Sequence, residues 1–221
     1  MTWILIILSL LITVAAQIGV KATFSKYSKI QNERGLTGAE AARQMLLEHG
    51  ITDVQIEPIA GKLSDHYDPT ANVIRLSEDV YDKATVAAVG VAMHEAGHAV
   101  QYATGYKPVL LRNAIVKSTT ASSYISYLLV LLGIVFSSYN LITVGIWFFC
   151  VVIFFQLVTL PVEFNASGRA ISTLKSTMLL SEHERSGAAS VLRAAAMTYV
   201  AAVAVSLLQL LRLLLIRGRR R

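Results

Sequence analysis

Two histidines and a glutamate near the middle of the chain have the types and the spacing of a zinc site. His94, Glu95 and His98 form the pattern HExxH. Histidines four residues apart project from one face of a helix, where both imidazoles can bind a single zinc ion. Glu95 would then lie beside the ion, and its carboxylate could take a proton from a bound water whose pKa zinc lowers to about 7. The motif therefore predicts peptide-bond hydrolysis with one zinc ion per chain.

The residues around the motif argue against a chance match. An accidental HExxH is expected in roughly one chain in a hundred of this length. Here the motif lies in an Ala- and Val-rich segment, 84–102, where two histidines and a carboxylate would be costly without a partner. This segment is too short and too polar at its centre to cross a membrane, so it is predicted to be a core helix. Its small side chains would let another helix pack close to the metal.

A catalytic zinc ion needs a third protein ligand, and several known arrangements are excluded. The metzincin pattern HExxHxxGxxH fails because Gln101 and Thr104 occupy the glycine and histidine positions. An intramembrane site-2-type protease would need a later aspartate, and no aspartate follows Asp82. The acidic or imidazole side chains that remain after His98 are Glu163, Glu182, His183 and Glu184.

Glu163 is the favoured third ligand. Glu182 and Glu184 belong to a capping box that opens the last helix, which gives them a structural role. Glu163 instead follows Pro161, where an apolar span is expected to end and a new helix to begin. Two predicted spans separate His98 from Glu163, so both would lie on the same side of a membrane. The alternative is that Glu163 is an ordinary charge at the membrane interface.

Four apolar stretches indicate a membrane protein. The chain is 54% apolar and only 15% charged, against roughly 25% charged residues in an ordinary soluble domain. The second and third stretches are joined by a short polar turn and predict a transmembrane hairpin. The predicted segments are an anchor at 1–20, a catalytic domain at 21–118, the hairpin at 119–160, a third-ligand helix and linker at 161–193, and a transmembrane or interfacial helix with a basic tail at 194–221.

The catalytic segment has the mixed pattern of an α+β domain. Thr37 and Glu40 form a capping box for a helix over 38–49, which ends before Gly50. Residues 52–57 and 72–76 have strand patterns, and the DHYDPT sequence at 65–70 has turn composition.

The distribution of charge indicates which partner the chain binds, and its cysteine content limits disulfide formation. The whole net charge of +6 arises after residue 120, much of it in the arginine cluster 217–221 directly behind an apolar run. This placement indicates a lipid bilayer as partner and not a nucleic acid. The single cysteine, Cys150, lies in an apolar run and cannot form an intrachain disulfide.

Several segments resemble one known family. DHYDP at 65–69, RLS at 75–77, AMHEAGHAVQ at 92–101, EFNASGRA at 163–170 and AAAMTYV at 194–200 resemble the YugP-like neutral zinc metallopeptidases of bacterial membranes. More distantly, the chain is similar to HtpX and to the CAAX prenyl endopeptidases, in which HExxH, a transmembrane hairpin and ExxxD follow in that order. The resemblance implies a zincin-like metallopeptidase domain joined to about four transmembrane helices.

The resemblance also implies residue roles. His94, His98 and Glu163 match zinc ligands, and Glu95 matches the catalytic base. Ser167 stands where the distant relatives carry an aspartate that supports a ligand histidine, so Ser167 or Asn165 would have to supply that support.

Substrate contacts are also predicted. Zincin-like peptidases bind an extended peptide against an edge strand before the active helix, and the candidate residues are Asn72, Val73, Ile74, Arg75 and Leu76. An ordinary internal strand is the alternative. The candidate donors to the developing oxyanion are Tyr199, Arg193, Arg169, His183 and His66.

The predicted protein is thus a multi-pass enzyme of the cell membrane whose substrate is a peptide or protein, including membrane proteins. Lys21, Lys26 and Lys29 follow the first span, so the positive-inside rule predicts a cytoplasmic catalytic domain, although the terminal arginines oppose this if the last helix crosses fully. The main rival is a non-catalytic membrane protein with a structural zinc site of four ligands, which would have no use for Glu95. A transporter would need ionisable groups within the hairpin spans, which have none.

Overall fold

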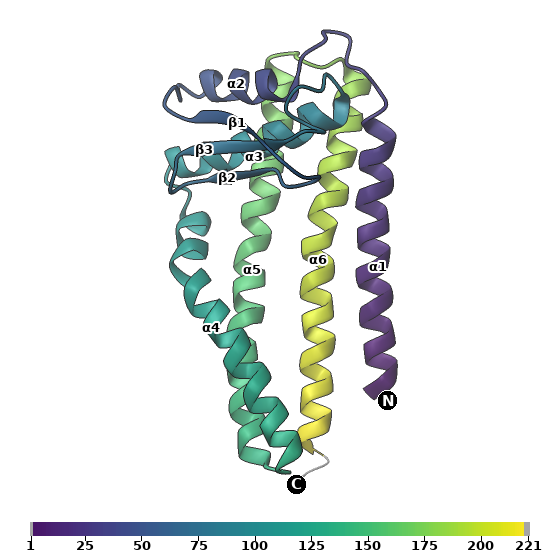
Figure 1. The fold of residues 1–221 in the computed structure, drawn as a ribbon, viewed down its shortest axis with the longest axis vertical. Helices are drawn as coiled ribbons and strands as arrows, with labels where there is room; N and C mark the ends of the chain where they lie inside the picture. The colour runs from purple at the N-terminus through teal and green to yellow at the C-terminus, as the bar shows by residue number, and fades with distance from the viewer. Residues whose placement is uncertain (1, 219–221) are drawn as a thin grey trace. The chain divides into compact units, whose positions relative to one another are not determined.

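The computed structural model describes residues 2–218 as six helices and three strands (Figure 1). In chain order, the elements are α1 (Thr2–Tyr27), α2 (Gly38–Glu48), β1 (Gln55–Ile59), β2 (His66–Asp68), β3 (Val73–Ser77), α3 (Val86–Ala103), α4 (Lys107–Val135), α5 (Tyr139–Ser176) and α6 (Glu182–Gly218). The last three arginines of the predicted basic tail lie outside the described residues.

The contacts divide the chain into two compact units. The helical unit comprises Met1–Gln17, Pro108–Pro161 and Met197–Arg221. The mixed unit comprises Ile18–Lys107 and Val162–Ala196 and contains the sheet, α2 and α3. All three predicted zinc ligands belong to the mixed unit.

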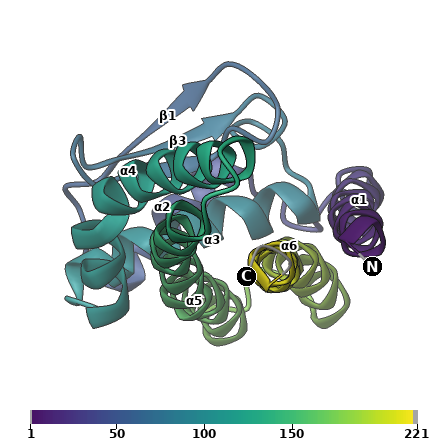
Figure 2. The ribbon, with the colours of Figure 1, turned by 90° about the horizontal axis from the view of Figure 1, so that it is seen from below.

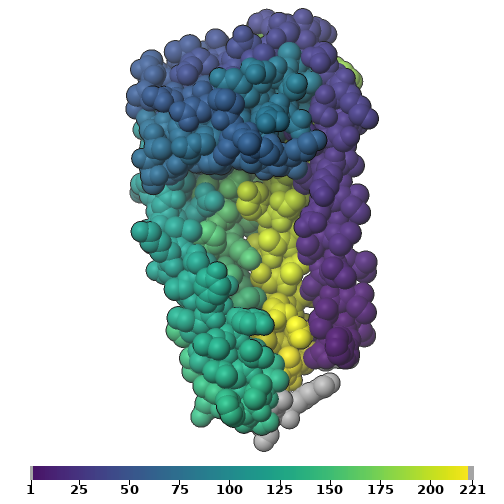
Figure 3. Space-filling model, in the orientation of Figure 1, coloured from purple at the N-terminus to yellow at the C-terminus, as the bar shows by residue number. Residues whose placement is uncertain are grey.

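Within residues 2–218, four helices are long and apolar enough to cross a membrane, namely α1, α4, α5 and α6. Figure 2 shows α1 and α6 nearly end-on, as separate columns. No residue of α1 is buried, and the purple helix in Figure 3 accordingly exposes its side chains along its length. So much exposed apolar surface is unfavourable in water and is expected where lipid covers it.

In the helical unit, α4 packs closely against α5 beside the turn that joins them. A Cβ atom on Gly133 would lie 2.8 Å from the backbone nitrogen of Ile142, so only glycine allows this approach. Deeper in the pair, the Ser126 hydroxyl donates a hydrogen bond of 2.8 Å to the carbonyl of Gly145. Small residues and hydroxyl groups at such contacts are typical of packed membrane helices.

Three helices extend beyond the apolar runs from which they were predicted. α4 begins at Lys107 and not at Thr119, and α6 begins at Glu182 and not at Ala194. Pro161 lies inside the continuous helix α5, so the prediction that a new helix starts there was wrong. Hydropathy marks the apolar run and not the end of the helix, and prolines are tolerated in membrane helices because other groups satisfy the freed backbone carbonyl.

The mixed unit contains a three-stranded sheet with the strand order β1-β3-β2. β1 pairs in parallel with β3, and β2 pairs with β3 in the antiparallel sense, with Tyr67 opposite Ile74. β3 is therefore the central strand, so the alternative that residues 72–76 form an ordinary internal strand is confirmed and the prediction of an edge strand was wrong. The edge positions belong to β1 and to β2, which lies within the segment expected to be a turn.

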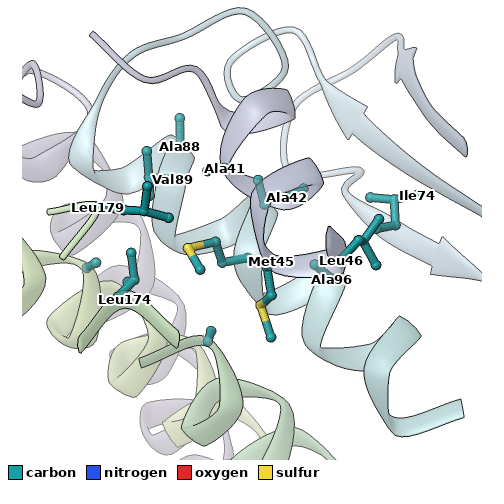
Figure 4. Packing of buried hydrophobic residues seen from close by; sticks show 14 of the residues in the cluster. Ala41, Ala42, Met45, Leu46, Ile74, Ala88, Val89, Ala96, Leu174 and Leu179 are labelled. Atoms are coloured by element: carbon teal, nitrogen blue, oxygen red, sulfur yellow. The ribbon is translucent and has the colours of Figure 1, made fainter. Parts of the chain in front are cut away.

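The hydrophobic core of the mixed unit lies where α2, α3 and the sheet meet. Figure 4 shows Met45 and Leu46 of α2 beside Ala96 of α3 and near Ile74 of β3, and all four are fully buried. The predicted capping box at Thr37 and Glu40 is confirmed and opens α2. α3 contributes mostly alanine, valine and glycine to this core, so its neighbours approach its backbone closely. This close packing holds the HExxH segment in place.

Candidate zinc centre

α3 carries His94, Glu95 and His98 on consecutive turns. The helix opens at Thr85, whose hydroxyl accepts a hydrogen bond of 3.2 Å from the backbone N–H of Ala88. The two imidazole rings meet edge to face with their centres 4.7 Å apart. The helical spacing thus places both rings on one face, as the motif predicted.

α5 supplies the third member of the cluster. Glu163 is only 3% exposed, and its Oε2 atom lies 3.3 Å from Nε2 of His94 and 3.6 Å from Nε2 of His98. Although it faces both rings, this buried oxygen has no hydrogen-bond partner among the described residues. A buried carboxylate oxygen without a hydrogen bond is costly unless a cation completes its surroundings.

A single glycine allows α3 and α5 to bring these groups together. A Cβ atom on Gly97 would lie 2.6 Å from the backbone carbonyl oxygen of Ala166, a distance that real side chains do not adopt. Gly97 precedes His98, and Ala166 lies one turn after Glu163. The absence of a side chain at position 97 therefore sets the separation between the histidine pair and the carboxylate.

The donor set fits a zinc ion. Zinc binds imidazole nitrogen at about 2.0–2.1 Å and carboxylate oxygen at about 2.0–2.2 Å, usually as a tetrahedron, so neighbouring ligand atoms lie about 3.4 Å apart. The two distances from the Glu163 oxygen to the histidine Nε2 atoms, 3.3 and 3.6 Å, bracket this value. The ligand atoms of all three residues lie within 4.8 Å of one another.

The electrostatics of the cluster also favour a cation. Burial alone lowers the pKa of His98. The contact with the Glu163 carboxylate and the negative charges of Glu95 and Glu163 raise this pKa by more than burial lowers it, so the net shift is upward. An upward shift means that the surroundings stabilise positive charge at this point. A divalent cation would benefit from the same field.

Each histidine has a second contact through its other ring nitrogen. Ser167 Oγ lies 3.1 Å from Nδ1 of His94, and Gln101 Oε1 lies 3.0 Å from Nδ1 of His98. Asn165 hydrogen-bonds neither imidazole among the described residues; its Oδ1 atom accepts hydrogen bonds from Gln101 and Arg169. Gln101 was not predicted as a site residue, although its position three residues after His98 on the same helix was a usable signal.

The carboxylate of Glu95 is held by the edge strand β2. Its Oε2 atom accepts a hydrogen bond of 3.0 Å from the backbone N–H of Tyr67, and Glu95 is 9% exposed. Asp65 in turn anchors the start of β2, because its carboxylate accepts hydrogen bonds from the backbone N–H and the hydroxyl of Ser77. The sequence did not reveal this role of Tyr67, because it uses the backbone and not the side chain.

Burial perturbs two groups beside Glu95. It raises the pKa of Asp65, and the charge of Glu95 adds to the rise, although the hydrogen bonds from Ser77 act in the opposite direction. Burial likewise raises the pKa of the Tyr67 hydroxyl, which donates a hydrogen bond of 2.9 Å to Asn72. Such clustered shifts are common at functional sites.

The predicted oxyanion donors lie in different places. His66 is on β2, directly before Tyr67, and its Nδ1 atom lies 2.8 Å from the carbonyl oxygen of Ser64. Arg169 is bound to Asn165, and His183 and Arg193 are exposed on α6. Tyr199 belongs to the helical unit.

Comparisons with known proteins agree with this chemistry. Residues 2–218 match a family described as "Putative neutral zinc metallopeptidase". A relative from Bacillus subtilis (strain 168), named "Putative membrane protease YugP", is 48% identical over 201 residues, which are 91% of this chain and 89% of the relative. No solved structure matches the chain.

Proposed function

The chain belongs to the neutral zinc metallopeptidase family, and on that basis we propose that it is a membrane-embedded zinc endopeptidase with a zincin-like active site. The observation that carries the proposal is the meeting of His94, His98 and Glu163, in which the Glu163 oxygen that has no hydrogen bond among the described residues faces both imidazoles. Glu95 follows His94 directly in the chain. A zinc site with a free coordination position for water needs a general base at this place.

Each group has a distinct task in the proposed reaction. His94, His98 and Glu163 would hold the ion, and bound zinc supplies the Lewis acidity that activates water and polarises the scissile carbonyl. Glu95 takes a proton from the attacking water and then donates it to the nitrogen of the leaving amine. The hydrogen bond from Tyr67 N–H holds the Glu95 carboxylate in place for both transfers.

The proposed substrate is an extended peptide segment of a protein, including membrane proteins. We place it along β2 and not along β3, because β2 is the edge strand whose backbone contacts Glu95. Strand addition at this edge would bring the peptide bond toward the base and the metal ligands.

A purely structural zinc site is the less favoured alternative. Such a site is closed by four protein ligands, whereas the described residues bring three together. A three-ligand set leaves a coordination position for water, as catalysis requires.

Removal of metal tests the proposal. Treatment of the purified full-length protein with a zinc chelator is expected to abolish cleavage of a quenched fluorescent peptide library, and added zinc is expected to restore it. Metal analysis should find one zinc ion per active chain. Cleavage that survives complete removal of zinc would contradict the assignment, and so would a zinc-loaded protein that cleaves neither peptides nor unfolded proteins.

We propose that the mixed unit faces the cytoplasm. Lys21, Lys26 and Lys29 support this by the positive-inside rule, whereas Arg217 near the end of α6 opposes it. A cysteine introduced into the turn 136–138 between α4 and α5 is expected to react with a membrane-impermeant thiol reagent in intact cells, with Cys150 replaced by serine. Reaction only after the cells are permeabilised would reverse the assignment.

A further inference from the structure

A chain of hydrogen bonds runs from α5 to the ring of His98, and two groups on α5 fix which atom of each pair donates. We propose that Gln101, held by the backbone of Val162 and by Asn165, which Arg169 orients, is a positioning residue that keeps His98 in the tautomer with the proton on Nδ1. This inference rests on the proposed function, since its purpose is to leave the lone pair of Nε2 free for zinc.

These two groups on α5 cannot exchange the roles of hydrogen-bond donor and acceptor. The carbonyl of Val162 can only accept, and it lies 2.7 Å from Nε2 of Gln101. The guanidinium of Arg169 can only donate, and its Nε atom lies 2.8 Å from Oδ1 of Asn165. Arg169 also stands 6.0 Å above the ring of Tyr106, which helps to hold the guanidinium in place.

The Val162 carbonyl and the Arg169 guanidinium determine how the side-chain amides of Gln101 and Asn165 are oriented. Because Arg169 donates to Asn165, the oxygen of the Asn165 amide must face it, and the same oxygen accepts from Gln101 at 3.0 Å. The amide nitrogen of Gln101 therefore has both of its hydrogens engaged, one by Val162 and one by Asn165. The oxygen of Gln101 is left to face His98.

The orientation of Gln101 selects the state of the imidazole. An amide oxygen can only accept, so Nδ1 of His98 must carry the hydrogen of their 3.0 Å hydrogen bond. In the neutral ring, Nε2 is then unprotonated, and its lone pair is available to a cation held between this nitrogen and the Glu163 oxygen, 3.6 Å away. Gln101 is fully buried, so water cannot readily replace it.

His94 provides an internal comparison. Its Nδ1 atom contacts the hydroxyl of Ser167, which can either donate or accept. Ser167 therefore does not select a tautomer of His94. The hydrogen bonds fix the tautomer of His98 but not that of His94. Loss of Gln101 should consequently harm zinc binding more than loss of Ser167.

The test compares Gln101→Leu, Gln101→Glu and Ser167→Ala in the full-length protein. For Gln101→Leu, zinc affinity is expected to fall about 10- to 100-fold, and for Ser167→Ala about tenfold or less. Gln101→Glu keeps an acceptor for Nδ1 and is expected to bind zinc at least about tenfold more tightly than Gln101→Leu. Gln101→Glu still loses the two hydrogen bonds that the amide nitrogen donates, so its folding stability is measured separately.

The tautomer is measured directly in the metal-free protein. Nitrogen-15 NMR of labelled histidine, in alkaline buffer where imidazoles are neutral, is expected to show His98 with its proton on Nδ1 in the wild type and in Gln101→Glu. In Gln101→Leu, the two tautomers are expected to mix. These readouts require neither zinc nor peptidase activity, so they can fail independently of the proposed function.

Three results would overturn the inference. One is a wild-type His98 with its proton on Nε2. Another is a folded Gln101→Leu protein with unchanged tautomer and zinc affinity. The third is a Gln101→Glu protein that binds zinc as weakly as Gln101→Leu, because the amide would then matter for packing alone. If Gln101→Leu does not fold, the wild-type and Gln101→Glu spectra decide the question.

Discussion

Replacement of Glu95 by glutamine is expected to lower peptide hydrolysis by about 10²- to 10⁴-fold, the usual contribution of a general base. Glutamine has nearly the same size as glutamate and retains an oxygen that can accept the hydrogen bond from Tyr67 N–H. It cannot take a proton from water at neutral pH. The measurement is the rate of cleavage of a fluorescent peptide, beside the zinc content of the same preparation.

Zinc content separates loss of the base from loss of the site. Glu95 is not one of the three residues whose ligand atoms converge, so Glu95→Gln should retain one zinc ion per chain. Glu48→Gln, at the exposed end of α2, is the matched control and should cleave at the wild-type rate. A Glu95→Gln protein with normal cleavage would remove Glu95 as the general base, and with it the proposed zincin-like mechanism.

The second large effect is expected at Glu163. Glu163→Gln replaces a buried carboxylate, the proposed third ligand, with a neutral amide, and zinc affinity should fall by more than about 100-fold, beyond what loss of a supporting group usually costs. Zinc binding at 1,000 times its dissociation constant stabilises a folded protein by about 4 kcal/mol. At the zinc concentration that produces this stabilisation in the wild type, thermal unfolding of Glu163→Gln should show almost none.

The control for Glu163→Gln is Glu182→Gln, an exposed acidic residue in the first turn of α6. Its zinc affinity and zinc-dependent stabilisation should match those of the wild type. If Glu163→Gln binds zinc normally while folded, Glu163 is only an ion-pair partner of the histidines, and another residue must complete the site.

The sequence predicted the parts of the site that depend on local spacing. His94 and His98 are four residues apart on one helix, and their meeting requires nothing beyond helical geometry. Glu163 is 65 residues beyond His98, and it was found by excluding other acids and by counting membrane spans. The groups that the prediction missed act through tertiary contacts, although the spacing of Gln101 from His98 on one helix was a usable local signal. Gln101 matters through its orientation against α5, and Tyr67 through a backbone N–H on a strand of three residues.

The prediction that the substrate binds an edge strand at residues 72–76 was wrong for a related reason. Residues 72–76 were correctly expected to form a strand, but strand order within a sheet depends on pairing between distant segments. The short strand β2 was masked by its turn composition, since DHYDPT also supplies the Asp68 side chain that hydrogen-bonds the backbone N–H groups of Thr70 and Ala71. With β2 at the edge, β3 becomes internal.

The position of Glu163 in α5, the second helix of the α4–α5 hairpin, has a consequence for biosynthesis. The ribosome completes α3, with two of the three proposed ligands, before it makes either helix of the hairpin. A nascent or truncated chain that stops before α5 therefore has an incomplete zinc site, whatever the metal supply. The proposed zinc-dependent cleavage would then require a chain whose hairpin has already been synthesised.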